Sequence, residues 1–168
     1  MHQHYSGADA FLVPVVEVQL LIHAPGAPGM RWLGLGPGLK PTRSLFKLQR
    51  LLNQHAFWAS GRSLAGLRTM LRESNVIVSL WREKRLIGFA RATSDGIYRG
   101  VLWDVVIPED LQGQGLGRRI VDAIVKSKQL RSVERIYLMT TNGEGFYKQL
   151  GFETETNQIL MKRLQQLD

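Results

Sequence analysis

Apolar residues recur along the chain with two periods, and each period predicts a different secondary structure. Recurrence every three or four positions favours helices, whereas alternation or a short run of β-branched residues favours strands. We expect helices that begin at the caps Ser44 and Ser63, and helices over 116–129 and 144–150. We expect strands over 76–81, 86–93, 101–107, 134–140 and 157–163, and two earlier strands near Val18 and over 31–35.

The order of these elements predicts an α/β fold of the α+β kind, with one central, mixed and mostly antiparallel sheet and helices on both faces. The helix over 116–129 connects the strands 101–107 and 134–140 as a crossover, so these two strands are expected to be parallel. A chain of 168 residues is long enough for one domain with a real core. We assign residues 1–30 to an N-terminal extension that carries an extra strand, and residues 31–168 to the domain.

A glycine-rich turn follows the strand 101–107 and opens the next helix, reading Gln112-Gly113-Gln114-Gly115-Leu116-Gly117. Glycine allows unusual dihedrals and leaves the amides bare, and the first N–H groups of a helix form a natural anion site. Arg118 and Arg119 would also suit an anion. The spacing matches neither the dinucleotide fingerprint nor the nucleoside-triphosphate loop. The turn therefore predicts a phosphate-bearing ligand, with a plain helix-entry turn as the alternative.

Two motifs in this order resemble those of a known family. The spacing Q-x-x-G-x-G at Gln112, Gly115 and Gly117 resembles the acyl-coenzyme A pyrophosphate loop of the GNAT N-acetyltransferases. The segment 141–152 resembles the family's N-x-x-x-x-Y-x-x-x-G-F motif. Together with Trp103-Asp104-Val105 and Phe146-Tyr147-Lys148, these motifs make the sequence similar to the plastid and cyanobacterial branch of the family, to which plant serotonin N-acetyltransferases belong. The resemblance extends over residues 31–163.

The resemblance implies a GNAT fold whose two parallel strands splay apart beyond a bulge, so that the pantetheine arm of the coenzyme enters the gap. It implies an acetyl-CoA-dependent N-acetyltransferase that transfers acetyl to a primary amine by direct attack in a ternary complex. The acceptor would be a serotonin-like arylalkylamine, as in melatonin biosynthesis, or a protein lysine or N-terminal amine. The residues expected to bind acetyl-CoA are Val105, Val106, Ile107, Gln112, Gly113, Gln114, Gly115, Leu116, Gly117, Arg118, Asn142 and Tyr147.

Two side chains are candidates for catalysis. Tyr147 would protonate the departing thiolate, and the alternative is a packed tyrosine whose hydroxyl bonds to backbone. Asp104 would be the general base, because a carboxylate in an apolar strand is costly unless it has a use. Its alternative is an ion pair with Arg91 or Arg99. Glu144 is the second choice for the base, and a water chain is the third.

Three further residues are expected around the acceptor. His55 and Trp58 fall where the family's early helices cover the acceptor site, and Tyr98 could form the opposite wall. The alternative for Trp58 is ordinary core packing. For Asn142, bonding to the pantetheine arm and capping of the following helix are equally open.

Composition narrows the function further. Lys and Arg number 22 against 14 Asp and Glu, a net charge of +8 that favours anionic partners. The chain has no cysteine, so it offers no disulfide, no thiol nucleophile and no cysteine-bound metal, and we expect no metal cofactor. We expect a cytoplasmic or plastid-stromal protein without a membrane span, and a homodimer stays open. A basic nucleic-acid-binding or regulatory acyl-CoA-binding module without turnover is the alternative function, although no nucleic-acid motif appears.

Overall fold

A single five-stranded sheet organises the molecule, in the order β1-β2-β3-β4-β5. The computed structural model describes residues 17–23 and 43–165. The first three strand pairs are antiparallel, and the last pair, β4 with β5, is parallel. The predicted mixed and mostly antiparallel sheet is therefore confirmed. The strands are β1 (Val18–His23), β2 (Val76–Arg82), β3 (Arg85–Ser94), β4 (Arg99–Val106) and β5 (Arg135–Tyr137).

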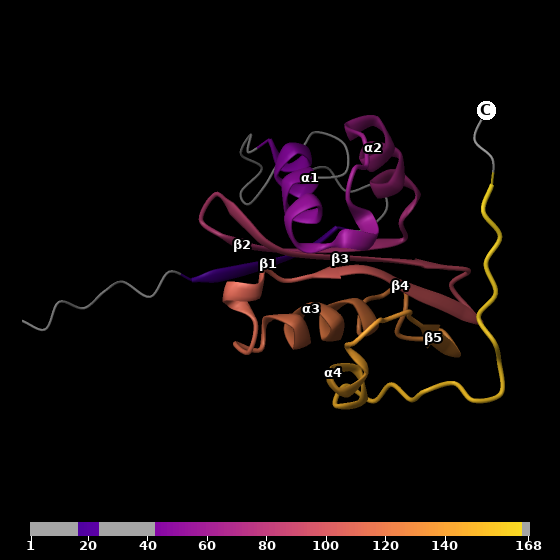
Figure 1. Ribbon diagram of the computed structural model, residues 1–168. Helices are drawn as coiled ribbons and strands as arrows, with labels where there is room; N and C mark the ends of the chain where they lie inside the picture. Colours follow the sequence, from indigo (N-terminus) through magenta and orange to yellow (C-terminus); the bar gives the residue numbers. More distant parts are fainter. Residues whose placement is uncertain (1–16, 24–42, 166–168) are drawn as a thin grey trace, which may run out of the picture.

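Helices cover both faces of this sheet, as predicted (Figure 1). One face carries α1 and α2, and the other carries α3 and α4. Within residues 17–23 and 43–165, the helices are α1 (Ser44–His55), α2 (Leu64–Glu73), α3 (Leu116–Val125) and α4 (Glu144–Lys148). Two short 3₁₀ helices in this part of the chain, η2 (Phe57–Ala59) and η3 (Glu109–Leu111), follow α1 and β4 respectively.

The two faces of the sheet hold separate hydrophobic clusters. On the α1 and α2 side, Trp81 and Phe89 are fully buried among leucines of the helices. On the α3 side, Ile120 and Ile124 pack with the other face of β2 and β3. Burial of this apolar surface is the main force that holds the helices on the sheet. The strands β2 and β3 read as nearly continuous apolar runs because both of their faces are covered.

Several sequence predictions agree with these elements. The strand near Val18 is present as β1 and pairs with β2, and Ser63 caps α2 by accepting a hydrogen bond from the Gly66 N–H. The assignment of residues 1–30 to an extension stays a prediction, and the strand expected over 31–35 lies outside the described residues. The helix expected over 116–129 ends at Val125, because the turns after it close with hydrogen bonds to the third preceding carbonyl.

Two predictions are wrong. Ser44 does not cap α1, since the cap position is Arg43 in the left-handed region and Ser44 is the buried first residue of the helix. The strand expected over 157–163 does not form. Residues 153–165 run extended without helix or strand, and Ile159, Leu160 and Met161 are 74–90% exposed. The neighbouring edge, β5, is only three residues long and offers little ladder to a further strand.

Candidate active site

The glycine-rich turn presents bare backbone at the start of α3. Gly113 and Gly115 have φ of 75° and 76°, a region that favours glycine, and no atom lies within 4 Å of a Cβ built at either position. Gly115 is the N-cap of α3, and no side chain caps the helix. The first turn of α3 also lacks an acidic residue. The free N–H groups and the positive end of the helix dipole therefore face open space, as an anion site requires.

Gly117 has a different role from the other two glycines in the turn. A Cβ at Gly117 would lie 3.1 Å from the Phe146 ring, so the missing side chain lets α3 and α4 approach each other. The second motif therefore packs directly against the first. The two motifs that are about thirty residues apart in the sequence form one site in the structure.

Side chains of the turn are held by the surrounding backbone. Gln112 donates from Nε2 to the Ile107 carbonyl at 3.2 Å, and Arg118 donates to the Gln149 carbonyl at the end of α4 at 3.4 Å. Leu116 is buried, so its side chain anchors the turn and only its backbone faces outward. Gln114 is exposed. Arg118 ties α3 to α4 while its guanidinium remains at the surface.

The parallel strands β4 and β5 pair over a short stretch only. The three registered pairs join 99–101 to 135–137, while β4 continues to Val106. Residues 102–106 of β4 therefore have no strand partner on the β5 side within the described residues. Such an open edge exposes N–H and C=O groups that a ligand can bind. This geometry agrees with the expected splay beside Val105, Val106 and Ile107.

A β-bulge lies in the middle of β4. Between two registered pairs, Ala90 of β3 faces both Asp104 and Val105 of β4. Asp104 has φ of 52°, the left-handed conformation that the first residue of one class of bulge adopts. Aspartate tolerates this conformation better than most residues. The bulge lies three residues beyond Val101, where the pairing of β4 with β5 ends.

The Asp104 carboxylate is held by two arginines. Its Oδ2 accepts from Arg91 Nε at 2.7 Å and from Arg62 Nη1 at 2.9 Å, and the Asp104 side chain is 3% exposed. Burial by itself raises the pKa of Asp104, but the hydrogen bonds and charges of Arg62 and Arg91 outweigh it and leave the pKa below its usual value. The ion pair with Arg91 that the sequence allowed is therefore present. Arg99 instead pairs with Glu134.

Tyr147 lies in α4 between two phenylalanines. Its ring packs edge-on against Phe146 at 4.9 Å and Phe152 at 5.8 Å, between ring centroids. Its ring is partly buried, and burial raises the pKa of the phenol. The phenol is therefore protonated at neutral pH and able to donate a proton. Its ring packs as the structural role requires, but within the described residues its hydroxyl makes no hydrogen bond to backbone.

Asn142 and Glu144 of the second motif are exposed. Asn142 does not cap α4, because the cap position is Gly143 and no side chain caps that helix. Glu144 binds Lys148 and Thr154, each at 2.7 Å. The hydrogen bond from Lys148, followed by the one from Thr154, lowers the pKa of Glu144. A carboxylate already bonded in this way is a weak candidate for a base.

The three acceptor candidates do not form one pocket. Tyr98 precedes β4, is 61% exposed and lies at the opposite end of that strand from Pro108, which follows it. His55 lines a hollow together with Pro108. The eight residues of β4 span roughly 26 Å at about 3.3 Å per residue, so Tyr98 and His55 are far apart. Trp58 is 51% exposed and pairs edge-on with Phe57, so it is not core.

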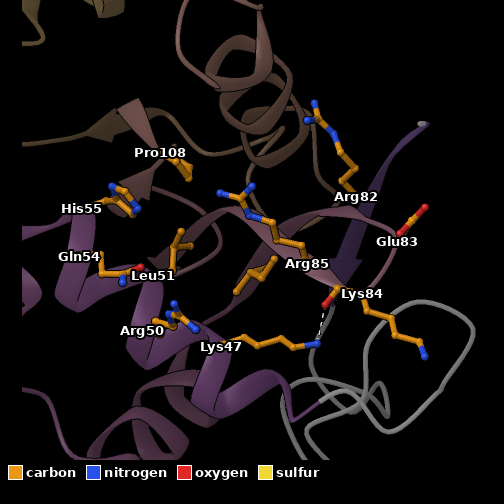
Figure 2. Close-up of a pocket in the computed structure, with 11 residues that line it drawn as sticks. Lys47, Arg50, Leu51, Gln54, His55, Arg82, Glu83, Lys84, Arg85 and Pro108 are labelled. Carbon is orange, nitrogen blue, oxygen red and sulfur yellow. Dashed lines mark hydrogen bonds between the residues drawn. The ribbon is translucent and has the colours of Figure 1, made fainter. Parts of the chain in front are cut away.

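A basic hollow near His55 was not found from the sequence. It has a volume of about 610 Å³ and lies between α1, the turn from β2 to β3, and Pro108 (Figure 2). Its lining residues are Lys47, Arg50, Leu51, Gln54, His55, Arg82, Glu83, Lys84, Arg85, Leu86 and Pro108. We call it the α1–hairpin hollow. Its sequence signal is the charged turn 82–85, but only the fold shows that this turn faces the basic side of α1.

Two kinds of site are absent from residues 17–23 and 43–165. No group of three or more His, Cys, Asp or Glu side chains is placed to hold a metal ion. No helix in this part of the chain has the length and apolar character needed to cross a membrane.

Comparison with known proteins identifies the architecture. The acetyltransferase (GNAT) domain model matches residues 73–154, which include β2, the bulge, the glycine turn and α4. A solved structure from Xanthomonas campestris pv. campestris, described as belonging to the GNAT family, superposes with a TM-score of 0.66. It is 22% identical and covers 87% of this chain and 93% of its own. The chain has the GNAT fold.

Sequence relatives of this GNAT-fold protein are also acetyltransferases by name. The uncharacterized N-acetyltransferase ycf52 of Pyropia yezoensis is 38% identical over 117 residues, which are 65% of this chain and 64% of the relative. The histone acetyltransferase TAP1 of Glycine max is 34% identical over 110 residues, 58% of this chain and 48% of the relative. The chain thus spans less than two thirds of the length of each.

Proposed function

We propose that this GNAT-fold protein is an acetyl-CoA-dependent N-acetyltransferase. One observation carries the proposal: bare amides at the start of α3 come soon after β4, separated from it only by η3 and the glycine turn, and the edge of β4 toward β5 is open beyond Val101. The amides suit a diphosphate, and the open edge suits an extended chain with amide groups. Acetyl-CoA offers both features in one molecule, together with a thioester that activates the acetyl group.

The residues of the site divide the work as follows. The N–H groups of 115–117 bind the diphosphate, and the backbone of 105–107 binds the pantetheine arm and the thioester oxygen. An amine nitrogen forms a bond to the acetyl carbon, the bond from that carbon to sulfur breaks, and the amine loses a proton. Tyr147 donates a proton to the departing sulfur, because its phenol stays protonated at neutral pH.

Asp104 suits a positioning role better than that of the base. A carboxylate with a lowered pKa and two arginine partners would have to leave them to accept a proton. By holding Arg62 and Arg91, Asp104 fixes the bulge that opens the edge of β4. We therefore assign removal of the amine proton to water in the cleft and keep Asp104 as the support of the bulge.

The acceptor is a primary amine, and two classes are supported by different observations. A protein lysine or N-terminal amine is favoured by the strongly basic surface, which suits an acidic protein partner. An arylalkylamine such as serotonin is favoured by the exposed Phe57 and Trp58 pair, whose rings meet at 5.1 Å. The relative TAP1 is named a histone acetyltransferase, which agrees with the first class.

The decisive experiment compares two glycines with the same geometry. Gly115 and Gly96 have φ of 76° and 82°, and neither has an atom within 4 Å of a built Cβ. Gly115→Val is expected to abolish acetyl-CoA binding in calorimetry, whereas Gly96→Val bears the same backbone strain away from the site and should bind normally. Release of free thiol, read with a thiol reagent, follows turnover without background because the chain has no cysteine. Equal binding by both variants would remove the glycine turn from the coenzyme site.

A further inference from the structure

Five cationic side chains line the α1–hairpin hollow against one acidic residue. Lys47 and Arg50 come from α1, and Arg82, Lys84 and Arg85 come from the end of β2, the turn and the start of β3, whereas Glu83 is the one carboxylate among the described lining residues. Figure 2 shows Arg50, Arg85 and His55 directed toward the same space, while Arg82, Glu83 and Lys84 point away from it. The hollow therefore presents positive charge that its own lining does not balance.

Three of these residues have no close counterion among the described residues. Burial, followed by repulsion from Lys84, lowers the pKa of Lys47. The Nε atom of Arg82 is buried and has no hydrogen-bond partner. Arg85 reaches one acid, Asp110, at a long 3.9 Å between two exposed side chains. Cations gathered without close counterions indicate a site that is completed by an anion.

The hollow lies on the face of the sheet that carries α1 and α2 (Figure 1). It is formed by α1 and the hairpin, on the face that also carries Arg62 beside Asp104, whereas α3 lies on the other face (Figure 1). Pro108, which lines the hollow, is four residues beyond Asp104, just after the end of β4. Four extended residues span roughly 13 Å. A peptide whose amine reaches the open edge of β4 can thus place a side chain three or four positions away in the hollow.

The size and lining indicate the class of anion. A volume of about 610 Å³ admits a few side chains and is too small for a nucleic-acid duplex. Among the described residues, the lining has no Phe, Tyr or Trp on which an unpaired base could stack. Arginine presents a planar fork of donors that matches a carboxylate. Acidic side chains of a protein fit these features.

We propose that the α1–hairpin hollow binds Asp or Glu side chains of a protein acceptor, three or four residues from the amine that becomes acetylated. This inference rests on the proposed function and names its substrate class. The hollow acts as a specificity site: it selects the acceptor by charge, while the chemistry takes place at the edge of β4.

The test uses lysine peptides that carry Glu, Gln or Lys at the third and fourth positions from the acceptor lysine. The wild-type protein should acetylate the Glu peptide with a kcat/KM at least tenfold above that of the Gln peptide at low salt. The double variant Arg50→Glu/Arg85→Glu should lose this preference through a higher KM for the Glu peptide. Its kcat/KM for the Gln peptide and its KM for acetyl-CoA should stay within twofold. Arg68→Glu, an exposed charge reversal on α2, is the matched control and should keep the preference.

Two results would overturn the inference while the acetyltransferase stands. Equal kcat/KM for the Glu and Gln peptides would show that the hollow does not recognise acidic side chains of the acceptor. A raised KM for acetyl-CoA in the double variant, with the peptide preference intact, would assign the hollow to the coenzyme.

A direct binding measurement separates the inference from the proposed function. Fluorescence anisotropy of a labelled Glu peptide reports binding even if no peptide is acetylated. Peptide binding that is weakened tenfold in the double variant supports the hollow as a binding site for acidic side chains, independently of any acetylation. Absence of peptide binding in the wild-type protein, or tighter binding of a single-stranded oligonucleotide that the double variant loses, overturns it.

Discussion

The sheet consists of a closed half and an open half, and the difference between them separates stability from function. In the closed half, β2 and β3 pair over seven registers and are buried on both faces. In the open half, β4 and β5 pair over three registers, and the side chains of β5 are partly or fully exposed. The closed half satisfies its own backbone, whereas the open half leaves donors and acceptors for a ligand. The following predictions test this division, from the largest expected effect to the smallest.

The largest effect is expected from a matched pair of phenylalanines. Phe89 in β3 is fully buried, whereas Phe146 in α4 is 36% exposed. Phe89→Ala should lower the free energy of unfolding by about 3–5 kcal/mol, because it leaves a cavity in the closed half. Phe146→Ala should cost about 1–2 kcal/mol, because the side chain is only partly buried. Urea unfolding measures both, and equal losses would show that the two halves contribute alike.

Asp104 should show the second largest effect. Asp104→Asn keeps a residue that tolerates the left-handed conformation but leaves two partly buried arginines without their charge partner, at a cost of about 2 kcal/mol. The pKa of Asp104 is lowered in the folded protein, so its contribution is complete above the unfolded value, about 3.9. It is lost as the pH falls further, through the folded pKa.

The measurement for Asp104 is urea unfolding at a series of pH values. The stability difference between wild type and Asp104→Asn should be constant near neutral pH and should shrink below about pH 4. A difference that does not change down to pH 3 would contradict the ion pair as its origin. Ala90→Gly, a change opposite the bulge, is the control, because it alters packing but no charge.

Tyr147 should affect turnover more than stability. Tyr147→Phe keeps the packing against Phe146 and Phe152 but removes the proton donor, so kcat should fall about 100-fold while acetyl-CoA binding stays unchanged. Because burial raises the pKa of Tyr147, any alkaline decline of kcat that it causes lies above pH 10 in the wild type. Steady-state kinetics and calorimetry give the two quantities. A variant with wild-type kcat would exclude Tyr147 as the acid.

The smallest effect is expected at the start of α2. Ser63→Ala removes the cap that accepts the Gly66 N–H at 3.0 Å and should lower stability by about 1 kcal/mol. The cap follows Arg62 directly, so the variant should also loosen the arginine that reaches Asp104 from the closed half. Thermal unfolding measures the loss, and Ser132→Ala at an exposed turn is the control. A loss no larger than that of the control would contradict the cap.

The parts of the fold that follow from local sequence were predicted well. The β-branched runs of β2 and β3, the crossover helix and the Ser63 cap depend on residues close together in the chain. The glycine turn was found for the same reason, since its dihedrals need glycine whatever surrounds it.

The parts of the structure that depend on contacts between distant residues were not predicted. The α1–hairpin hollow arises from residues more than thirty positions apart, and no local pattern brings Arg50 to Arg85. Arg62 as the second partner of Asp104 was missed for the same reason. The strand expected over 157–163 does not form because alternating apolar residues are not sufficient for a strand. A strand also needs a neighbouring edge to pair with, and β5 is only three residues long.

The extra residue at Asp104 has a consequence for exchanging parts between relatives. Side chains alternate along a strand, so one inserted position reverses which face each later side chain meets. Deleting Asp104 would turn Val106 and the approach to Gln112 toward the wrong layer of the molecule. A chimera that grafts a new glycine turn onto this scaffold should therefore keep the β-bulge at Asp104 and Val105 of β4.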